Sequence, residues 1–518
     1  MPFNYCTGSN PPFDPETYIA DTELHARAEA HLAKGDLQSA IAESFSLSRA
    51  DAYVYHASVS VVLGQVQHVI KLGRANGLHD WYREVPSSSS SSDGERKGVS
   101  SGSSISAVNN DDNDDDNDDP KNTSQGPHAK IPRHPNPPPP AALPPPPQPD
   151  IEAYLSIFAP STATPSALKT FLANAKKGSL RSRAAAYLLS KRYIHPAYAP
   201  QLSKLRFRPR ANNNNGMPPP NPYLSFLRFA CRELEWCGPV AGDDPTATTT
   251  AMSMSHHVLP VLMHHFGCAC PSYEVLEVLR LLARGREVVD VGSGGGYWTF
   301  ALRRHIAAIE NTDPTAGANT IATVTVTPVD SAQSSWRTTW VRDTVVADGA
   351  VYLRDRRGGA PDAVLLLVYP IVGADGEFTR AMMRAFRGDT LAVVGTQDRA
   401  GYTGFRGESM DEFVARDPVL GRGWVRVVQV ALPSFPGKDE ALFVFQRGEA
   451  APPPPEEEGM VSTGDGKGEE GGEGEEGGER GGGGGGEGDK GDEKEKKKKK
   501  RKKNKKNNKK DENKEEDS

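Results

Sequence analysis

Residues 256–447 predict an α/β fold, a parallel sheet with helices on both faces. In this region, stretches rich in β-branched and apolar residues alternate with longer stretches in which apolar residues recur at helical spacing. One strand candidate, DAVLLLVYP (362–370), is unbroken in its apolar character, which is typical of a strand buried on both faces. A regular alternation of strands and helices produces this architecture.

The expected elements follow one another in a regular order. The helices are expected at 256–266, 272–285, 298–310 and 377–386, and Ser272 is a suitable N-cap for the second of them. The strands are expected at 287–291, 320–330, 362–370, 390–395, 424–432 and 440–446. The turn PSFPGKD between the last two strands is a hairpin signal, so we expect an antiparallel pair at the edge of the sheet.

Helical segments precede this region. Residues 1–85 form an expected helical N-terminal segment, in which 21–83 show helical spacing around the turn at Gly35 and Asp36. This stretch resembles one helix–turn–helix of the tetratricopeptide type, and a plain helical hairpin is the alternative. Residues 151–220 form a second helical segment with an Asn/Pro linker, and a helix over 222–238 opens the domain expected at 221–447.

Two low-complexity stretches are expected to be disordered. Residues 86–150 combine serine, Asp/Asn and proline runs, and residues 448–518 are rich in Gly, Glu and Lys. Twelve Lys or Arg residues and no acid lie within 496–510. Such a segment suits a polyanion or a nuclear import receptor as a partner.

Several classes of protein do not fit the composition. The five cysteines are odd in number and scattered, which favours a reducing compartment over a disulfide framework. No apolar run approaches the ~18 residues that span a bilayer, and the N-terminus lacks the pattern of a secretory signal. We therefore expect an intracellular protein without a membrane partner, in the cytoplasm or the nucleus.

The most informative stretch is REVVDVGSGGGYWTF, residues 286–300, in which Gly292, Gly294 and Gly296 follow a strand and open a helix. Glycine is required where φ is positive or where another group approaches the backbone closely. This place in an α/β fold is a nucleotide-binding position. A dinucleotide fingerprint would need Gly or Ala at Tyr297 or Thr299, so NAD and FAD are not predicted.

The remaining pattern, D-x-G-x-G-x-G, resembles motif I of the class I S-adenosylmethionine-dependent methyltransferases. The resemblance extends over 256–447, because the order of elements also matches. It implies a seven-stranded, mostly parallel Rossmann-like sheet with a C-terminal antiparallel hairpin. It also implies S-adenosyl-L-methionine as the cofactor and an enzyme that methylates an acceptor which the sequence does not identify.

The resemblance also implies roles for residues of the loop itself. Gly292, Gly294 and Gly296 would let the loop pass against the amino-acid part of the cofactor. Asp290 would orient this loop or meet the ammonium group of the cofactor.

Further roles follow for the ends of the later strands. Asp330 would accept both ribose hydroxyls, since a carboxylate offers two acceptor oxygens. Asp348 would receive the adenine amino group, with the amide of Gly349 nearby. Tyr369 follows the fourth strand, where substrate and sulfonium meet in the family.

Some features depart from the family pattern. Residues 310–320 (ENTDPTAGANT) look like an inserted loop, and VYPIVG after the fourth strand lacks the Asn/Asp-Pro-Pro-aromatic signature of certain amino-group methylators. The acceptor is therefore undefined. If it needs a general base, the candidates are Tyr369, His265 and His264.

Histidines and cysteines gather before motif I. Within fifteen residues lie His256, His257, His264, His265, Cys268 and Cys270. Neighbouring helical residues point ~100° apart, and C-x-C is tighter than the usual zinc spacing, so no metal site is predicted. One of these histidines could line the active site, and helix packing is the alternative.

A function of a different class also fits the sequence. The chain could be a non-catalytic interaction protein whose Rossmann-like core binds S-adenosylmethionine weakly or not at all. Its proline run and lysine-rich tail would then tether partners. The presence of Asp290, Asp330 and Asp348 together favours the enzyme.

Overall fold

The computed structural model describes residues 6–7, 12–48, 51–57, 59–76, 79–82, 143–207, 218–240, 256–310, 323–372, 375–405 and 407–453. The chain divides into two units, Met1–Pro455 and Glu456–Ser518, and the second contains no described residue. Residues 86–142 of the expected linker 86–150, residues 311–320 of the expected inserted loop 310–320 and the lysine-rich tail therefore lie outside the described residues. The last residues of the expected linker are described, and a helix begins there at Gln148. The domain boundaries stay a prediction.

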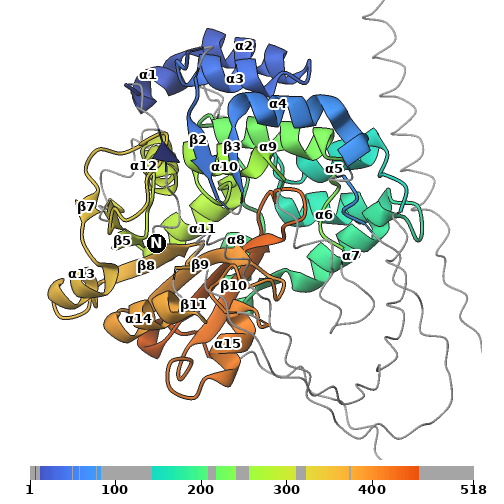
Figure 1. Ribbon diagram of the computed structural model, residues 1–518. Coiled ribbons are helices and arrows are strands. Elements are labelled where there is room, and N and C mark those ends of the chain that lie inside the picture. Colours follow the sequence, from blue (N-terminus) through green and yellow to red (C-terminus); the bar gives the residue numbers. More distant parts are fainter. Residues whose placement is uncertain are drawn as a thin grey trace, which may run out of the picture. The chain divides into compact units, whose positions relative to one another are not determined.

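The centre of the first unit is a sheet of eight strands in the order β4-β10-β11-β9-β8-β5-β6-β7 (Figure 1). Its strands are β4 (Tyr193–Ile194), β5 (Glu287–Val291), β6 (Val326–Asp330), β7 (Val345–Val346), β8 (Ala363–Val368), β9 (Thr390–Thr396), β10 (Val425–Ala431) and β11 (Glu440–Gln446). Strands β5 to β9 pair in parallel, whereas β11, β10 and β4 pair antiparallel. The predicted mostly parallel α/β sheet is thus observed.

Two details of the predicted sheet were wrong. The sheet has eight strands instead of seven, because Tyr193 and Ile194, from a segment expected to be helical, pair with Gln429 and Val428 of β10. The last two strands do form an antiparallel pair, but neither of them is the edge strand of the sheet. Strand β11 lies between β9 and β10, and β4 covers the outer side of β10.

The strand order locates the site at which a ligand is expected. Strand β5 lies between β6 on one side and β8 on the other. From β5 the chain continues outward to β6 and β7, and it then crosses back to form β8 and β9 on the other side of β5. In open α/β sheets, ligands bind outside the carboxyl ends of the strands at such a switch point. The loops that follow β5 and β8 meet there.

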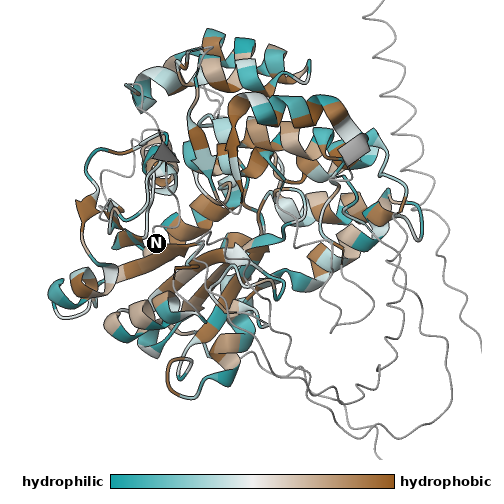
Figure 2. Ribbon diagram, viewed as in Figure 1, coloured by the Kyte–Doolittle hydropathy of each residue, from teal (hydrophilic) through white to brown (hydrophobic). Residues whose placement is uncertain are grey.

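Helices cover both faces of the sheet. They are α11 (Tyr273–Ala283), α12 (Tyr297–Glu310), α13 (Gly349–Asp355), α14 (Glu377–Ala385) and α15 (Met410–Arg416). Helices α9 (Pro222–Glu233) and α10 (Val258–Phe266) share a core with the N-terminal segments instead. Helices α11 and α12 share a core with Val288 and Leu366, and α13 to α15 share another with the neighbouring Val289 and Leu365. Successive strand residues point to opposite faces, which explains the unbroken apolar strands shown in brown in Figure 2. Among the described residues no helix is long and apolar enough to cross a membrane.

The segments before residue 221 pack against these elements. Their helices are α1 (Pro15–Ala20), α2 (Thr22–Leu32), α3 (Leu37–Ser44), α4 (Leu63–Leu72), α5 (Gln148–Ser156), α6 (Thr164–Ala173), α7 (Leu180–Lys191) and α8 (Ala199–Leu202). The expectation of helices throughout 21–83 was wrong at 54–62. There β2 (Val54–His56) and β3 (Ser60–Val62) form a small sheet with β1 (Cys6–Thr7). The β-branched residues of VYHASVSVV favour this extended conformation.

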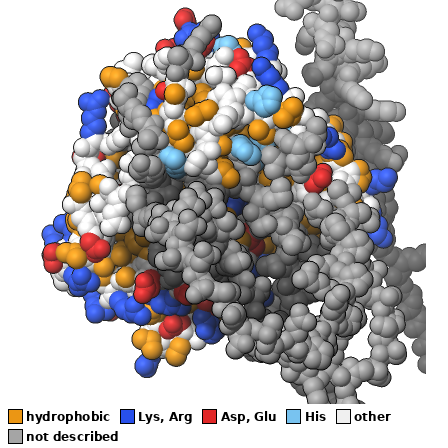
Figure 3. Space-filling view, in the orientation of Figure 1, with side chains coloured by type: hydrophobic (Ala, Val, Ile, Leu, Met, Phe, Trp, Pro, Cys, Tyr) orange, Lys and Arg blue, Asp and Glu red, His pale blue; other side chains and the backbone are white. Residues whose placement is uncertain are grey.

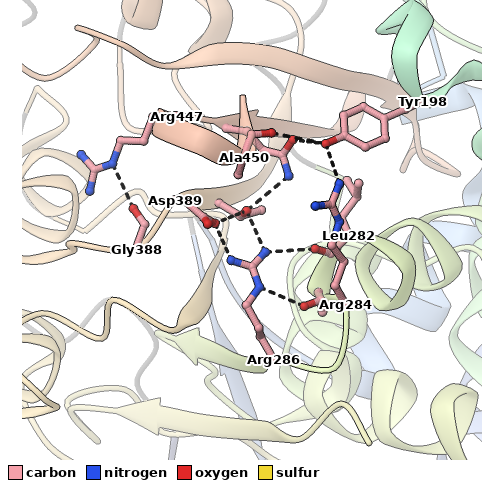
Figure 4. Close-up of polar contacts among 11 residues, drawn as sticks. Tyr198, Leu282, Arg284, Arg286, Gly388, Asp389, Arg447 and Ala450 are labelled. Carbon is pink, nitrogen blue, oxygen red and sulfur yellow. Dashed lines mark hydrogen bonds and ion pairs between the residues drawn. The ribbon is translucent and has the colours of Figure 1, made fainter. Parts of the chain in front are cut away.

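The amino ends of the strands are joined by arginine side chains (Figure 4). Arg286, directly before β5, pairs with Asp389 and donates to Thr390 Oγ1 at 3.0 Å and to the Leu282 carbonyl at 3.1 Å. These contacts tie β5, β9 and α11 together at the edge opposite the loop after β5. This edge therefore has a structural role, and the opposite edge carries the candidate site.

Charged side chains of both signs interleave on the part of the surface where α13 and α14 lie (Figure 3). The exposed ion pair between Arg357 and Asp362, at 2.6 Å, is an example from this region. An exposed pair of this kind contributes little to stability because water and salt screen it.

Candidate functional site

The loop after β5 turns sharply because of its glycines. Gly292, Gly294 and Gly296 have φ values of 78°, 57° and 79°, in the left-handed region that L residues rarely adopt. The amide of Gly292 donates to the Val329 carbonyl at 2.8 Å, and that of Gly294 donates to Asp330 Oδ2 at 2.9 Å. The loop is thus tied to the end of the neighbouring strand β6.

Part of what approaches the glycine backbone is the protein itself. We call residues 336–341 the covering segment. A Cβ atom added to Gly294 would lie 2.8 Å from Trp336 Cζ2, and one added to Gly295 would lie 2.8 Å from the Thr338 carbonyl oxygen. At Gly296 it would overlap Val341, whereas at Gly292 it would meet Phe378 at an ordinary 3.5 Å. Packing of the covering segment therefore explains much of the glycine requirement.

Asp290 is fully buried below this loop. Its Oδ2 accepts a hydrogen bond from Thr299 Oγ1 at 2.7 Å, while Oδ1 has no partner in the part of the chain that the structure describes. Burial raises the pKa of Asp290 to about 7, and the negative charge of Asp330 adds to the effect. An unpartnered buried carboxylate oxygen is costly, and a donor from a ligand would offset that cost.

Asp330 ends β6, which lies beside β5, and Asp348 follows β7, the next strand along the sheet. Both oxygens of Asp330 accept backbone amides, from Gly294 at 2.9 Å and from Ala332 at 2.7 Å, and each oxygen retains a second lone pair. Asp348 follows β7 and caps α13, since its Oδ1 accepts the Val351 amide at 2.9 Å. Gly349 begins α13, where a Cβ atom would overlap Val291. Their assignment to the cofactor stays a prediction.

Tyr369 follows β8 and has a backbone φ of 50°, which is unusual for an aromatic residue. Its hydroxyl donates to Glu440 Oε1 at 2.7 Å. Burial and the adjacent Glu440 carboxylate raise the pKa of Tyr369 far above its ordinary value, so the phenol is protonated. The sequence interpretation missed Glu440. The available signal was an acid at the start of an otherwise apolar strand, EALFVFQ.

The two histidines proposed as bases are engaged with the N-terminal segment. His265 Nε2 lies 3.0 Å from the Tyr55 hydroxyl and Nδ1 lies 2.8 Å from Thr338 Oγ1, so both ring nitrogens have partners. His264 Nε2 lies 2.7 Å from the His56 carbonyl oxygen. Burial lowers the pKa of His264 to about 4 and that of His265 well below its ordinary value.

Both rings are therefore neutral, and they join the small N-terminal sheet to α10 and the covering segment. The geometry gives them a structural role and offers no support for either as a general base.

Of the other members of the His/Cys group, His256 and Cys270 are buried, whereas His257 and Cys268 are partly exposed. His256 accepts the Val258 amide at 3.1 Å through Nδ1, and burial lowers its pKa to about 3. Burial raises the pKa of the Cys268 thiol to about 12 and also raises that of Cys270. Among the described residues no three His, Cys, Asp or Glu side chains lie together as a metal site would require.

Comparisons with known proteins give structural similarity only. No family model matches the chain, and no curated protein matches it. Among solved structures, a candidate SAM-dependent methyltransferase from Streptococcus mutans matches with 13% identity and a TM-score of 0.22, over 33% of this chain and 48% of that one. The present chain thus covers about half the length of that protein.

Two further solved structures are similar to the same extent. The antibiotic-resistance methyltransferase Kmr matches with 20% identity and a TM-score of 0.20. The match covers 36% of the present chain and 98% of the Kmr chain. The O-methyltransferase TomG from Streptomyces achromogenes matches with 15% identity and a TM-score of 0.19, over 35% of this chain and 83% of its own. At these values the matches supply no argument about activity, which has to rest on the residues of the site. The resemblance to S-adenosylmethionine-dependent methyltransferases, first seen in the sequence, is thus also present among the solved structures that match this chain.

Proposed function

We propose that this protein transfers the methyl group of S-adenosylmethionine to an acceptor. The observation that carries the proposal is the row of carboxylates along one edge of the sheet. Asp290 lies in β5, Asp330 ends β6, and Asp348 follows β7, and these strands are consecutive in the sheet, with β5 at the switch point. The loop with three positive-φ glycines lies beside them.

The described residues fit this cofactor chemically. The unpartnered Oδ1 of the fully buried Asp290 suits an ammonium group, directly or through water. The remaining lone pairs of Asp330 suit ribose hydroxyls, and Asp348 retains acceptor capacity for an exocyclic amine. When bound, the cofactor supplies a methyl group on a sulfonium. The protein contributes positioning and exclusion of water, which favour a reaction in which the sulfonium loses its charge.

Calorimetry with S-adenosylhomocysteine tests cofactor binding on the full chain. We expect heat of binding, and Asp330→Ala should weaken the affinity about 30- to 1,000-fold, which corresponds to roughly 2–4 kcal/mol for lost hydrogen bonds to a charged acceptor. Asp343→Ala is the matched control, because Asp343 forms an exposed ion pair with Arg303 at 2.8 Å, and Arg303 donates to the Val326 carbonyl at the opposite end of β6 from Asp330. Absence of heat at millimolar ligand on a folded sample would reject the proposal.

The competing function is a non-catalytic interaction protein. Labelled S-adenosylmethionine incubated with the protein and a cell extract separates the two functions. An enzyme places label in a protein, RNA or small-molecule fraction, whereas a binding protein gives calorimetric heat without incorporation. Possible binding of polyanions or of an import receptor by residues 496–510 is compatible with either function.

A further inference from the structure

The carboxyl edge of the sheet carries a second buried carboxylate site, beyond the glycine loop. Tyr369 lies there directly after β8, and its amide donates to the Val394 carbonyl of β9 at 2.8 Å. Its left-handed φ of 50° is the kind of backbone strain that persists only where the surroundings impose it, and such strain clusters at functional sites. The strained backbone directs the Tyr369 hydroxyl to Glu440 of β11.

Only one of the two carboxylate oxygens of Glu440 has a hydrogen-bond partner among the described residues. The residue is 2% exposed. Oε1 accepts the Tyr369 hydroxyl at 2.7 Å, whereas Oε2 has no hydrogen-bond partner in the described part of the chain. The neighbouring Asp439 provides a contrast, since its two oxygens accept from Tyr187 at 2.5 Å and from Gln397 at 2.8 Å. Of these two adjacent buried acids, only Glu440 has an oxygen without a partner among the described residues.

The position of Glu440 suits a role beside the cofactor site. Glu440 pairs with Thr396 at the carboxyl end of β9, and β8 separates β9 from β5. Three strand spacings of ~4.8 Å place it roughly 14 Å along the edge from the glycine loop. A cofactor at the glycine loop and an acceptor beside it would together span this distance. Tyr369 lies between the glycine loop and Glu440.

Several titratable groups interact electrostatically with Glu440, and they come from every element packed around it. They are Tyr154, Tyr223, Cys231, Cys268, Cys270, Tyr369 and Lys438. The cysteine thiols and tyrosines are neutral because burial raises their pKa values, so Lys438 is the cation of this group. Its ammonium contacts the Tyr402 hydroxyl.

We propose that Glu440 is the general base for the methyl acceptor, held in place by Tyr369. This inference rests on the proposed function and names its acceptor class, a nucleophile whose O–H or N–H proton must leave. The nucleophile forms a bond to the methyl carbon, the carbon–sulfur bond breaks, and its electron pair stays on sulfur. The acceptor proton passes to Oε2 of Glu440.

The chemistry of the carboxyl group agrees with this role. Burial raises the pKa of Glu440 to about 7, while the hydroxyls of Tyr369 and Ser434 and the charge of Lys438 act in the opposite direction. A base is most effective when its pKa lies near the working pH. A thioether or carboxylate acceptor would need no base.

The first experiment compares the full-length protein with Glu440→Gln, and both are tested for S-adenosylhomocysteine binding and for transfer of label into a cell extract. Glutamine keeps the size of the side chain and can accept the Tyr369 hydroxyl, but it cannot take a proton. Cofactor affinity should stay within threefold, and transfer should fall about 10²- to 10⁴-fold. The matched control is Asp439→Asn, because the asparagine oxygen can accept from Gln397 and its amide can donate to the Tyr187 hydroxyl of this neighbouring buried site. It should retain transfer within about threefold.

The second experiment uses the pH profile of transfer. Tyr369→Phe removes the hydrogen bond that lowers the pKa of Glu440, so the acid limb of the profile should move to higher pH. A purely structural role of Tyr369 would lower the rate without moving this limb.

The outcomes separate the inference from the proposed function. If the wild-type protein binds no S-adenosylhomocysteine, the proposed function fails. If it binds and transfers label while Glu440→Gln transfers at the wild-type rate, Glu440 is not the base and the inference is overturned. An unmoved acid limb in Tyr369→Phe would equally overturn the positioning role of Tyr369.

Discussion

Alanine substitutions at three glycines measure how closely the covering segment packs on the loop after β5. Gly294→Ala combines two costs. A left-handed backbone costs an L residue roughly 1–2 kcal/mol. The new Cβ atom would also lie 2.8 Å from Trp336 Cζ2, and such overpacking typically costs about 1–3 kcal/mol. The expected destabilisation is therefore about 2–5 kcal/mol.

Two control glycines share the backbone cost without the overlap. Gly292 has φ 78° and its Cβ atom would meet Phe378 at 3.5 Å, and Gly358 has φ 71° with nothing within 4 Å. Gly292→Ala and Gly358→Ala should each cost only about 1–2 kcal/mol. The double variant Gly294→Ala/Trp336→Ala should lose the overlap term, which a double-mutant cycle with Trp336→Ala isolates.

The assay is urea unfolding of the full chain, followed by tryptophan fluorescence and circular dichroism, with the free energy taken where both signals coincide. Equal losses for Gly294→Ala and Gly358→Ala would refute the reasoning, because Trp336 would then not lie against the loop. Absence of coupling between positions 294 and 336 would refute it independently.

Three further predictions concern other parts of the chain. Arg337→Ala should cost about 3–5 kcal/mol in urea unfolding, because it breaks a buried ion pair with Asp51 at 2.7 Å, and a loss below 1 kcal/mol would contradict this. Asp290 has a folded-state pKa of about 7 against an ordinary 3.8, so its stabilising contribution is complete below pH 3.8 and is lost as the pH rises through 7. The thermal midpoint of Asp290→Asn relative to wild type should therefore rise between pH 4 and pH 8, and a constant difference would be inconsistent with this titration. Removal of residues 456–518 should leave S-adenosylhomocysteine affinity unchanged and abolish salt-sensitive RNA retention, and retention that persists would assign RNA binding elsewhere.

The sequence by itself determined the order and type of most elements of the α/β region. Strand β5 has the predicted limits of 287–291, and the strands beginning near 363, 390, 425 and 440 lie where their apolar runs predicted them. These elements are local in origin, because β-branched runs and helical periodicity act over a few residues. The glycine loop was predictable for the same reason.

Pairing between distant segments was decided only by the tertiary structure. Tyr193 and Ile194 become a strand because β10 offers them an open edge, and a two-residue strand leaves no periodic signal. The contact of Trp336 with Gly294 and that of Tyr369 with Glu440 also join residues far apart in the chain. The sequence identified the glycines, but only the fold showed that the covering segment packs against them. Only the fold showed, too, that Glu440, a buried carboxylate with one unpartnered oxygen among the described residues, lies beyond Tyr369. The physical reason is that burial and hydrogen-bond satisfaction depend on every neighbour in space, which a local pattern does not specify.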